Sequence, residues 1–185
     1  MAKSDKIKKL AFASILIALD VVLTYISNYI ITGNVNINIA LVTIVVGACM
    51  YGPFTGFVLG LINGLITLFA PATQAWFFPI SPLATIFLCL LKTSLAGLVA
   101  GIIYKMINKK NSFLAVILSS ISVPIINTGI FIIGVVLFFM DIYGNFTALI
   151  VGVLNVNFII EFIMMAVLIP AIYRILNVIM NKNQE

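Results

Sequence analysis

Three ionisable side chains stand inside long apolar stretches of the sequence: Asp20, Lys92 and Glu161. A charged group at the depth of a membrane-spanning helix costs at least about 2.5 kcal/mol, so it usually faces a partner or a cavity. Two kinds of chemistry fit these residues. In one, Lys92 pairs with Glu161 or Asp20 and holds helices together. In the other, Lys92 meets an anionic ligand and Glu161 accepts hydrogen bonds from it. We favour the first role for Asp20 and the second for Lys92 and Glu161.

Side-chain amides in the same stretches strengthen the ligand interpretation. They are Asn63, Asn127, Asn155 and Asn157. Asn157 precedes Glu161 by four residues, so both are expected on one face of a helix. Asn127 follows Pro124, where a kinked helix frees carbonyl groups that can face a cavity. Amides donate and accept hydrogen bonds without carrying charge, which suits a polar metabolite that is uncharged or weakly charged. Helix packing explains any one of them, whereas the set favours a pocket.

The composition sets the class of protein. The chain has 185 residues, of which 63% are hydrophobic and 8% charged, and its mean hydropathy is +1.27. Soluble domains carry about 25% charged residues, so this is an integral membrane protein with an all-α fold. The length allows one domain of about six spanning helices. The basic residues stand beside apolar segments and not on a face interleaved with aromatics, so no nucleic-acid partner is expected.

The sequence offers little for catalysis. Histidine is absent, which removes the commonest general base and metal ligand. Cys49 and Cys89 both lie in apolar segments and read as small buried side chains. We therefore expect no cofactor, no metal site and no enzymatic activity. The chain also lacks the GxxxxGK[ST] pattern of a nucleotide-binding loop, so any ATP hydrolysis would belong to a partner subunit.

The apolar runs predict six membrane-spanning helices within a single domain, residues 1–185. These are expected at about 10–31, 39–50, 54–69, 83–104, 113–139 and 147–179. The second and third are short for a full crossing. Between the third and fourth, Ala70–Pro82 holds three prolines, which forbid a continuous helix there. Its aromatic residues, Trp76 among them, would anchor the loop at the membrane surface or cover a binding site.

The positions of the basic residues predict the orientation. With six crossings, nine of the ten lysines and arginines fall on the side that holds both chain ends and the turn at Lys105–Asn111. Positively charged segments stay in the cytoplasm, so both termini are expected inside.

A glycine-rich stretch, Gly47–Gly64, lies in the middle of these helices. Gly52-Pro53 breaks it, and Pro53 suits the first turn of a new helix. Gly56 and Gly60 continue a four-residue step that places the glycines on one helical face, where another backbone can approach closely. We expect this face to pack the second and third helices on the first.

These residues carry a family resemblance. The chain resembles the substrate-binding S components of energy-coupling factor (ECF) vitamin transporters through Tyr51-Gly52-Pro53-x-x-Gly56-x-x-x-Gly60 and Ser14-x-x-x-Ala18. The resemblance covers essentially the whole chain. It implies a compact bundle in a bacterial cytoplasmic membrane that binds a vitamin with high affinity and has no ATPase activity. It also implies a transmembrane coupling subunit and two ATPase subunits as partners, with Ser14 and Ala18 docking on the former. Family members are thought to topple in the membrane and carry their pocket inward.

The resemblance places the pocket toward the outer side, among the later helices and under the outer loops. The residues that would line it are Lys92, Asn127, Asn155, Asn157 and Glu161, with Trp76 and Asn38 from the loops. The closing segment from Glu161 to Pro170 is similar to that of pantothenate-type members, and Lys92 would meet a carboxylate. Folate and riboflavin remain open. The competing hypothesis is a stand-alone secondary transporter that uses Asp20, Lys92 and Glu161 to move ions.

Overall fold

The computed structural model describes residues 3–30, 38–140, 144–145, 147 and 158–181, and within them it contains helices and no strand. The helices are α1 (Lys3–Ile30), α2 (Leu41–Tyr51), α3 (Pro53–Leu68), α4 (Pro71–Trp76), α5 (Pro82–Ile107), α6 (Ser112–Phe138) and α9 (Ile159–Asn181). The helix expected from residue 147 is described from Ile159 onward, and most of its first part lies outside the described residues.

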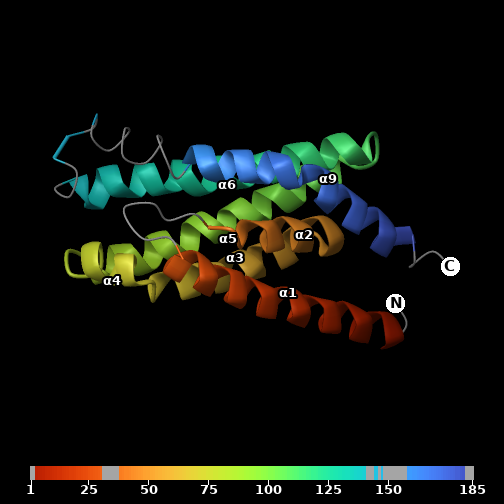
Figure 1. The fold of residues 1–185 in the computed structure, drawn as a ribbon, viewed down its shortest axis with the longest axis horizontal. Helices are drawn as coiled ribbons and strands as arrows, with labels where there is room; N and C mark the ends of the chain where they lie inside the picture. Colours follow the sequence, from red (N-terminus) through yellow and green to blue (C-terminus); the bar gives the residue numbers. More distant parts are fainter. Residues whose placement is uncertain (1–2, 31–37, 141–143, 146, 148–157, 182–185) are drawn as a thin grey trace.

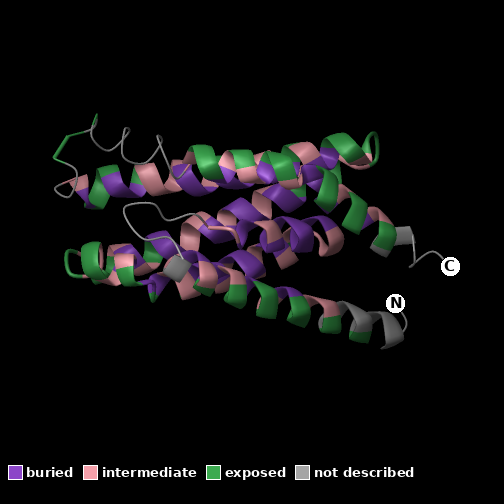
Figure 2. Cartoon of the chain, in the orientation of Figure 1, coloured by how far each residue is buried: buried purple, intermediate pink, exposed green. Residues whose placement is uncertain are grey.

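The long helices lie along one another in an elongated bundle (Figure 1). α5 packs most extensively, against α3 on one side and α6 on the other, while α1 covers α2 and α3 and α9 covers α6. Buried residues therefore gather on α2 and on the inward faces of α3, α5 and α6, and α1 exposes much of its surface (Figure 2). The two ends of the chain lie at the same end of the bundle (Figure 1).

The break between α2 and α3 occurs at Gly52. Its φ of 92° lies in a region that side chains disfavour, and its N–H donates to the Ala48 carbonyl at 3.0 Å, which ends α2. Pro53 then occupies the first turn of α3, where no intrahelical donor is needed. The turn lies at the end of the bundle that holds the chain ends (Figure 1).

The proline-rich segment after α3 contains a short helix that the sequence analysis did not predict. Pro71 stands in the first turn of α4, and the Phe77 N–H donates to the Thr73 carbonyl at its end. Pro82 begins α5 in the same way. The prolines thus start helices as well as interrupt them, because a missing N–H does no harm in a first turn.

The glycine face of α3 packs against α5. A Cβ atom on Gly56 would overlap the Gly97 backbone, and one on Gly60 would overlap the Thr93 carbonyl. The Thr93 hydroxyl donates to the Gly60 carbonyl at 2.6 Å across this contact. The expectation that this face packs on the first helix is therefore wrong: a face of small residues needs a partner that is equally small, and α5 supplies Gly97 where α1 does not.

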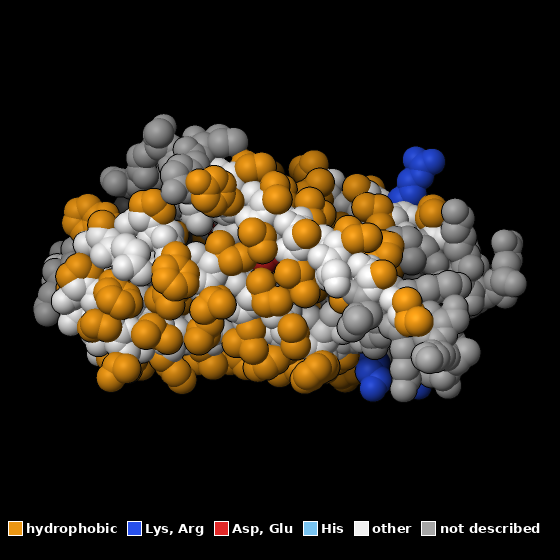
Figure 3. All heavy atoms as spheres, turned by 90° about the horizontal axis from the view of Figure 1, so that it is seen from below, with side chains coloured by type: hydrophobic (Ala, Val, Ile, Leu, Met, Phe, Trp, Pro, Cys, Tyr) orange, Lys and Arg blue, Asp and Glu red, His pale blue; other side chains and the backbone are white. Residues whose placement is uncertain are grey.

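Four described helices are long and apolar enough to cross a membrane: they contain Ala11–Asn28, Pro82–Ile107, Ser112–Phe138 and Ile159–Val178. The 11 residues of α2 and the 16 of α3 fall below that length. Hydrophobic side chains cover the visible surface between the ends of the bundle, and the visible Lys and Arg side chains lie at one end (Figure 3). This pattern is that of a body surrounded by lipid.

Candidate functional site

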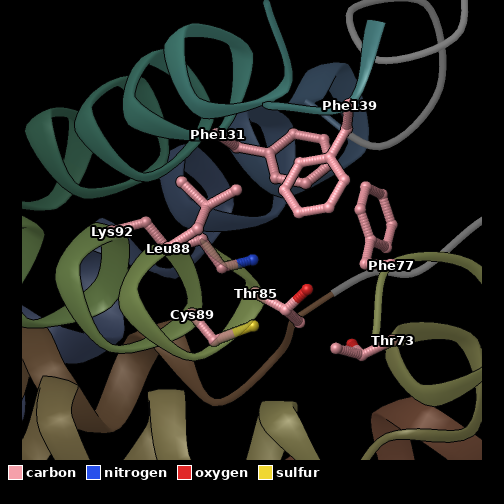
Figure 4. Close-up of a pocket in the computed structure, with 8 residues that line it drawn as sticks. All are labelled: Thr73, Phe77, Thr85, Leu88, Cys89, Lys92, Phe131 and Phe139. Atoms are coloured by element: carbon pink, nitrogen blue, oxygen red, sulfur yellow. The ribbon is translucent and has the colours of Figure 1, made fainter. Parts of the chain in front are cut away.

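A pocket is lined by residues of α4, α5 and α6 (Figure 4). The ribbon places α4 at the end of the bundle away from the start of α1 and the end of α9 (Figure 1). About 290 Å³ of space free of protein atoms lies between the lining residues of the pocket, a figure that includes space open to solvent, and the centre of a water-sized sphere can reach about 30 Å³ of it. Its lining comes from α4, α5 and α6 and the residues that follow α4 and α6, and consists of Thr73, Phe77, Thr85, Leu88, Cys89, Lys92, Phe131 and Phe139.

Three phenylalanine rings form one wall of the pocket. Phe77 meets Phe131 edge-on with ring centroids 5.7 Å apart, and it meets Phe139 in the same way at 5.2 Å. Edge-to-face contacts are favourable for aromatic rings and fix their relative orientation. Figure 4 shows Phe77 reaching toward the two α6-side rings from the segment after α4. The wall is therefore apolar and built from segments far apart in the sequence.

Lys92 is the charged residue of the pocket lining. Its side chain extends from α5 with the ammonium directed into the pocket (Figure 4), and the Nζ atom lies 5.2 Å from the centre of the Phe131 ring. An ammonium near an aromatic face gains about 0.5–2 kcal/mol. In the described part of the chain, Lys92 forms no salt bridge with Glu161 or Asp20, although its charge acts on Glu161.

Hydroxyl groups add the remaining polarity of the pocket. The Thr85 hydroxyl donates to the Ser81 carbonyl at 2.8 Å, so its oxygen keeps the capacity to accept a hydrogen bond from a ligand. Thr73 lies across the pocket on α4 (Figure 4). The described residues that line the pocket include no carboxylate. The pocket thus combines one cation and two hydroxyls with a mostly apolar wall.

Glu161 and Asn38 lie in a second polar cluster. The Asn38 backbone N–H donates to Glu161 Oε1 at 2.9 Å, and the Asn38 amide donates to Asn63 Oδ1 at 2.9 Å. Beside them, the Ile39 N–H donates to the Ser27 hydroxyl at 3.2 Å. Side chains from α1, α3 and α9 therefore hold Asn38 and Ile39, the residues that precede α2. Asn38 and Glu161 form hydrogen bonds within the protein and are not among the residues that line the pocket.

Asp20 belongs to the same cluster. Its Oδ1 atom accepts a hydrogen bond from the Thr43 hydroxyl at 2.6 Å and a long one from Asn63 Nδ2 at 3.4 Å. The Asn63 amide also donates to the Thr24 hydroxyl at 2.9 Å. Asp20 thus holds α1 to α2 and α3, through Thr43 and Asn63 and not through the pairing with Lys92 that the internal role proposed.

The other predicted site residues are dispersed. Asn127 is buried on α6, four residues and so about one turn from Phe131, and its Oδ1 atom has no hydrogen-bond partner in the described part of the chain. Asn155 and Asn157 lie outside the described residues. Trp76 is 63% exposed at the end of α4 and is not among the residues that line the pocket, whereas Phe77 is.

The predicted docking residues Ser14 and Ala18 lie on the exposed face of α1. Their exposed neighbours on this helix are apolar, Ile15 and Leu19 among them. Asp20 is buried on the opposite face, where it joins the polar cluster. The two faces of α1 therefore differ in chemistry: one is buried and forms hydrogen bonds to α2 and α3, and the other is exposed and mostly apolar.

Sequence reasoning missed Phe131 and Phe139, and it named Trp76 where the neighbouring Phe77 lines the pocket. In a chain with 14 phenylalanines, a Phe in an apolar helix gives no signal that separates a pocket wall from a lipid-facing surface. One signal was present for Phe131: it follows Asn127 by one helical turn on the face that already carried a polar residue.

We expect the Asn63→Leu substitution to destabilise the protein by about 3 kcal/mol, because it removes the Asn63 hydrogen bonds to the buried Asp20 and Thr24 side chains and to the half-buried Asn38 amide. The measurement is thermal unfolding in detergent. Thr67→Val is the matched control on the same helix, since the Thr67 hydroxyl bonds only within α3, to the Asn63 carbonyl at 2.9 Å. Equal unfolding midpoints for the two variants would show that the cluster adds no stability.

One comparison with known proteins gives a match. A family model described as the substrate-specific component of the ECF transporter matches residues 8–173. No curated protein and no solved structure gives a significant match. The matched region contains all the described residues of the pocket and of the polar cluster.

Proposed function

The chain belongs to the substrate-specific components of ECF transporters, integral membrane proteins that bind a small-molecule substrate for transport, and from this premise we propose that it is a high-affinity vitamin-binding subunit. The pocket between α4, α5 and α6 is the binding site in this proposal. The observation that carries it is the family match over residues 8–173 together with a pocket whose Lys92 ammonium has no acidic partner among the described residues.

We propose that the chain crosses the membrane six times with both termini in the cytoplasm. The helices α1, α2, α3, α5, α6 and α9 run in turn along the length of the bundle, and both chain ends lie at one end (Figure 1). That end also holds Lys105, Lys109 and Lys110, and basic residues favour the cytoplasmic side of a bacterial plasma membrane. The pocket would then lie toward the outer side.

Energy for transport would come from partners. We propose that a transmembrane coupling subunit docks on the α1 face that contains Ser14 and Ala18 and that two ATPase subunits drive the movement of the whole chain. Small side chains at this spacing let two helices approach closely in lipid, which supports the assignment. Pantothenate is the first candidate substrate, because its carboxylate suits Lys92.

Two measurements test this function. We expect the purified chain in detergent to bind one vitamin tightly, and we expect cells to take it up only when the coupling and ATPase subunits are co-expressed. Isothermal titration and uptake of radiolabelled vitamin give the two results. Uptake by this chain alone in energised vesicles, driven by a pH gradient, would contradict the proposal and favour the stand-alone transporter with Asp20, Lys92 and Glu161.

A further inference from the structure

We propose that the pocket selects a small organic monoanion, a carboxylic acid with an apolar body, and that Lys92 is the residue that determines this specificity. The inference rests on the proposed function and goes beyond it by naming the chemical class of the substrate. It depends on three features of the described residues: the charge of the lining, the position of the ammonium and the shape of the apolar wall.

The charge of the lining favours one negative charge on the ligand. Lys92 directs its ammonium into the pocket, and no carboxylate stands among the lining residues in the part of the chain that the structure describes (Figure 4). The charge of Lys92 acts on Glu161, whose Oε1 atom accepts a hydrogen bond from the Asn38 N–H. A cationic ligand would face repulsion in these surroundings, and a dianion would leave one charge without a partner.

The position of the ammonium lets it distinguish a negatively charged ligand from an uncharged one. Contact with the Phe131 ring at 5.2 Å holds it without neutralising it, because the ring offers a partial negative face and no full charge. Phe131 in turn is held by Phe77. Phe131 is therefore a positioning residue, and Lys92 is the group that would touch the ligand.

The wall beside the charge suits an apolar body. Phe77, Phe131 and Phe139 present ring edges and faces to the pocket. The Thr73 and Thr85 hydroxyls provide polar contacts at the margin of the wall. A ligand with several charges or many hydroxyl groups would leave some of them unpaired against the phenylalanines. A compact acid with one charge would leave no such group unpaired.

The experiment compares acids with their uncharged counterparts on the purified full chain. The probes are nicotinate and nicotinamide, biotin and biotin amide, and pantothenate and panthenol, with thiamin as a cation and riboflavin as a neutral compound. Titration calorimetry gives the affinities. In the pair that binds, we expect the acid to bind about 10- to 100-fold more tightly than its counterpart, the range for a hydrogen bond to a charged group. Lys92→Met should reduce this ratio to near one.

Two further variants keep the result interpretable. Lys92→Met replaces a cation among apolar groups by a side chain of similar length, so the fold should persist, and its thermal unfolding is measured beside the wild type. Lys105→Met, on the exposed surface at the other end of α5, is the matched control and should leave the ratio unchanged. Lys92→Arg should restore part of the preference for the acid over its uncharged counterpart, since the positive charge returns.

The outcomes separate the two proposals. If thiamin or riboflavin binds best, or if acid and counterpart bind equally, the inference fails while the vitamin-binding function stands. If Lys92→Met keeps the full preference for the acid, Lys92 is not the determinant and the inference fails. If no probe binds and uptake does not depend on ATPase partners, the proposed function fails and the inference with it.

Discussion

Replacement of Gly60 by alanine is expected to reduce the stability of the protein by about 3 kcal/mol, in the upper part of the range for overpacked cores. The added Cβ would overlap the carbonyl oxygen and carbon of Thr93 and the Cα of Ser94. All three atoms belong to the α5 backbone, so no side-chain rotation relieves the clash. The two helices must separate, and the hydrogen bond from the Thr93 hydroxyl to the Gly60 carbonyl at 2.6 Å is lost with the contact.

Gly129→Ala is the matched control for this prediction. Gly129 lies in α6, and a Cβ there would meet no atom of another described segment within 4 Å. Alanine in place of a helical glycine gains about 0.5–1 kcal/mol when nothing obstructs it. Thermal unfolding in detergent and the yield of monodisperse protein from membranes are the measurements. If Gly60→Ala is as stable as Gly129→Ala, the α3 and α5 backbones are not in direct contact.

The helical bundle could be predicted from sequence because its signals are local. Apolar runs, proline at a first turn and glycine at a break act within a few residues, so Gly52 and Pro53 stand where the sequence predicted a break. The partner of the glycine face was not predictable in this way. That Gly60 meets Thr93 of α5 depends on which helices become neighbours, and the small residues of α3 are compatible with any close partner.

The candidate site was predictable in part. Lys92 could be identified because a lysine in an apolar helix is costly and therefore rare. The same reasoning selected Glu161, which the structure places against the Asn38 N–H instead of in the pocket lining. A buried charge has to be paired, but the sequence does not tell whether its partner is a ligand or the backbone of a distant segment. The phenylalanines of the pocket wall carry no charge whose burial is costly, so nothing in the sequence distinguished them from other apolar residues.

Replacement of Ala18 by tryptophan is expected to abolish uptake while leaving vitamin binding within about twofold of the wild type. Ala18 lies on the exposed face of α1, so the indole would project into lipid and not into the bundle. The pocket is built from α4, α5 and α6, which the substitution does not touch. A large side chain would prevent the close approach of a second helix, which small residues allow. Uptake by cells that express all subunits, and calorimetry on the purified variant, give the two values.

Val167→Trp is the control for this variant, because Val167 is 71% exposed on α9 and apolar like its surroundings. It places the same indole in lipid on a helix that we do not assign to docking, so uptake should persist. Co-purification with the coupling subunit should follow uptake: lost for Ala18→Trp and kept for Val167→Trp. Should Ala18→Trp lose vitamin binding as well, α1 acts on the pocket itself, and the exposed face of this helix is not a separate docking surface.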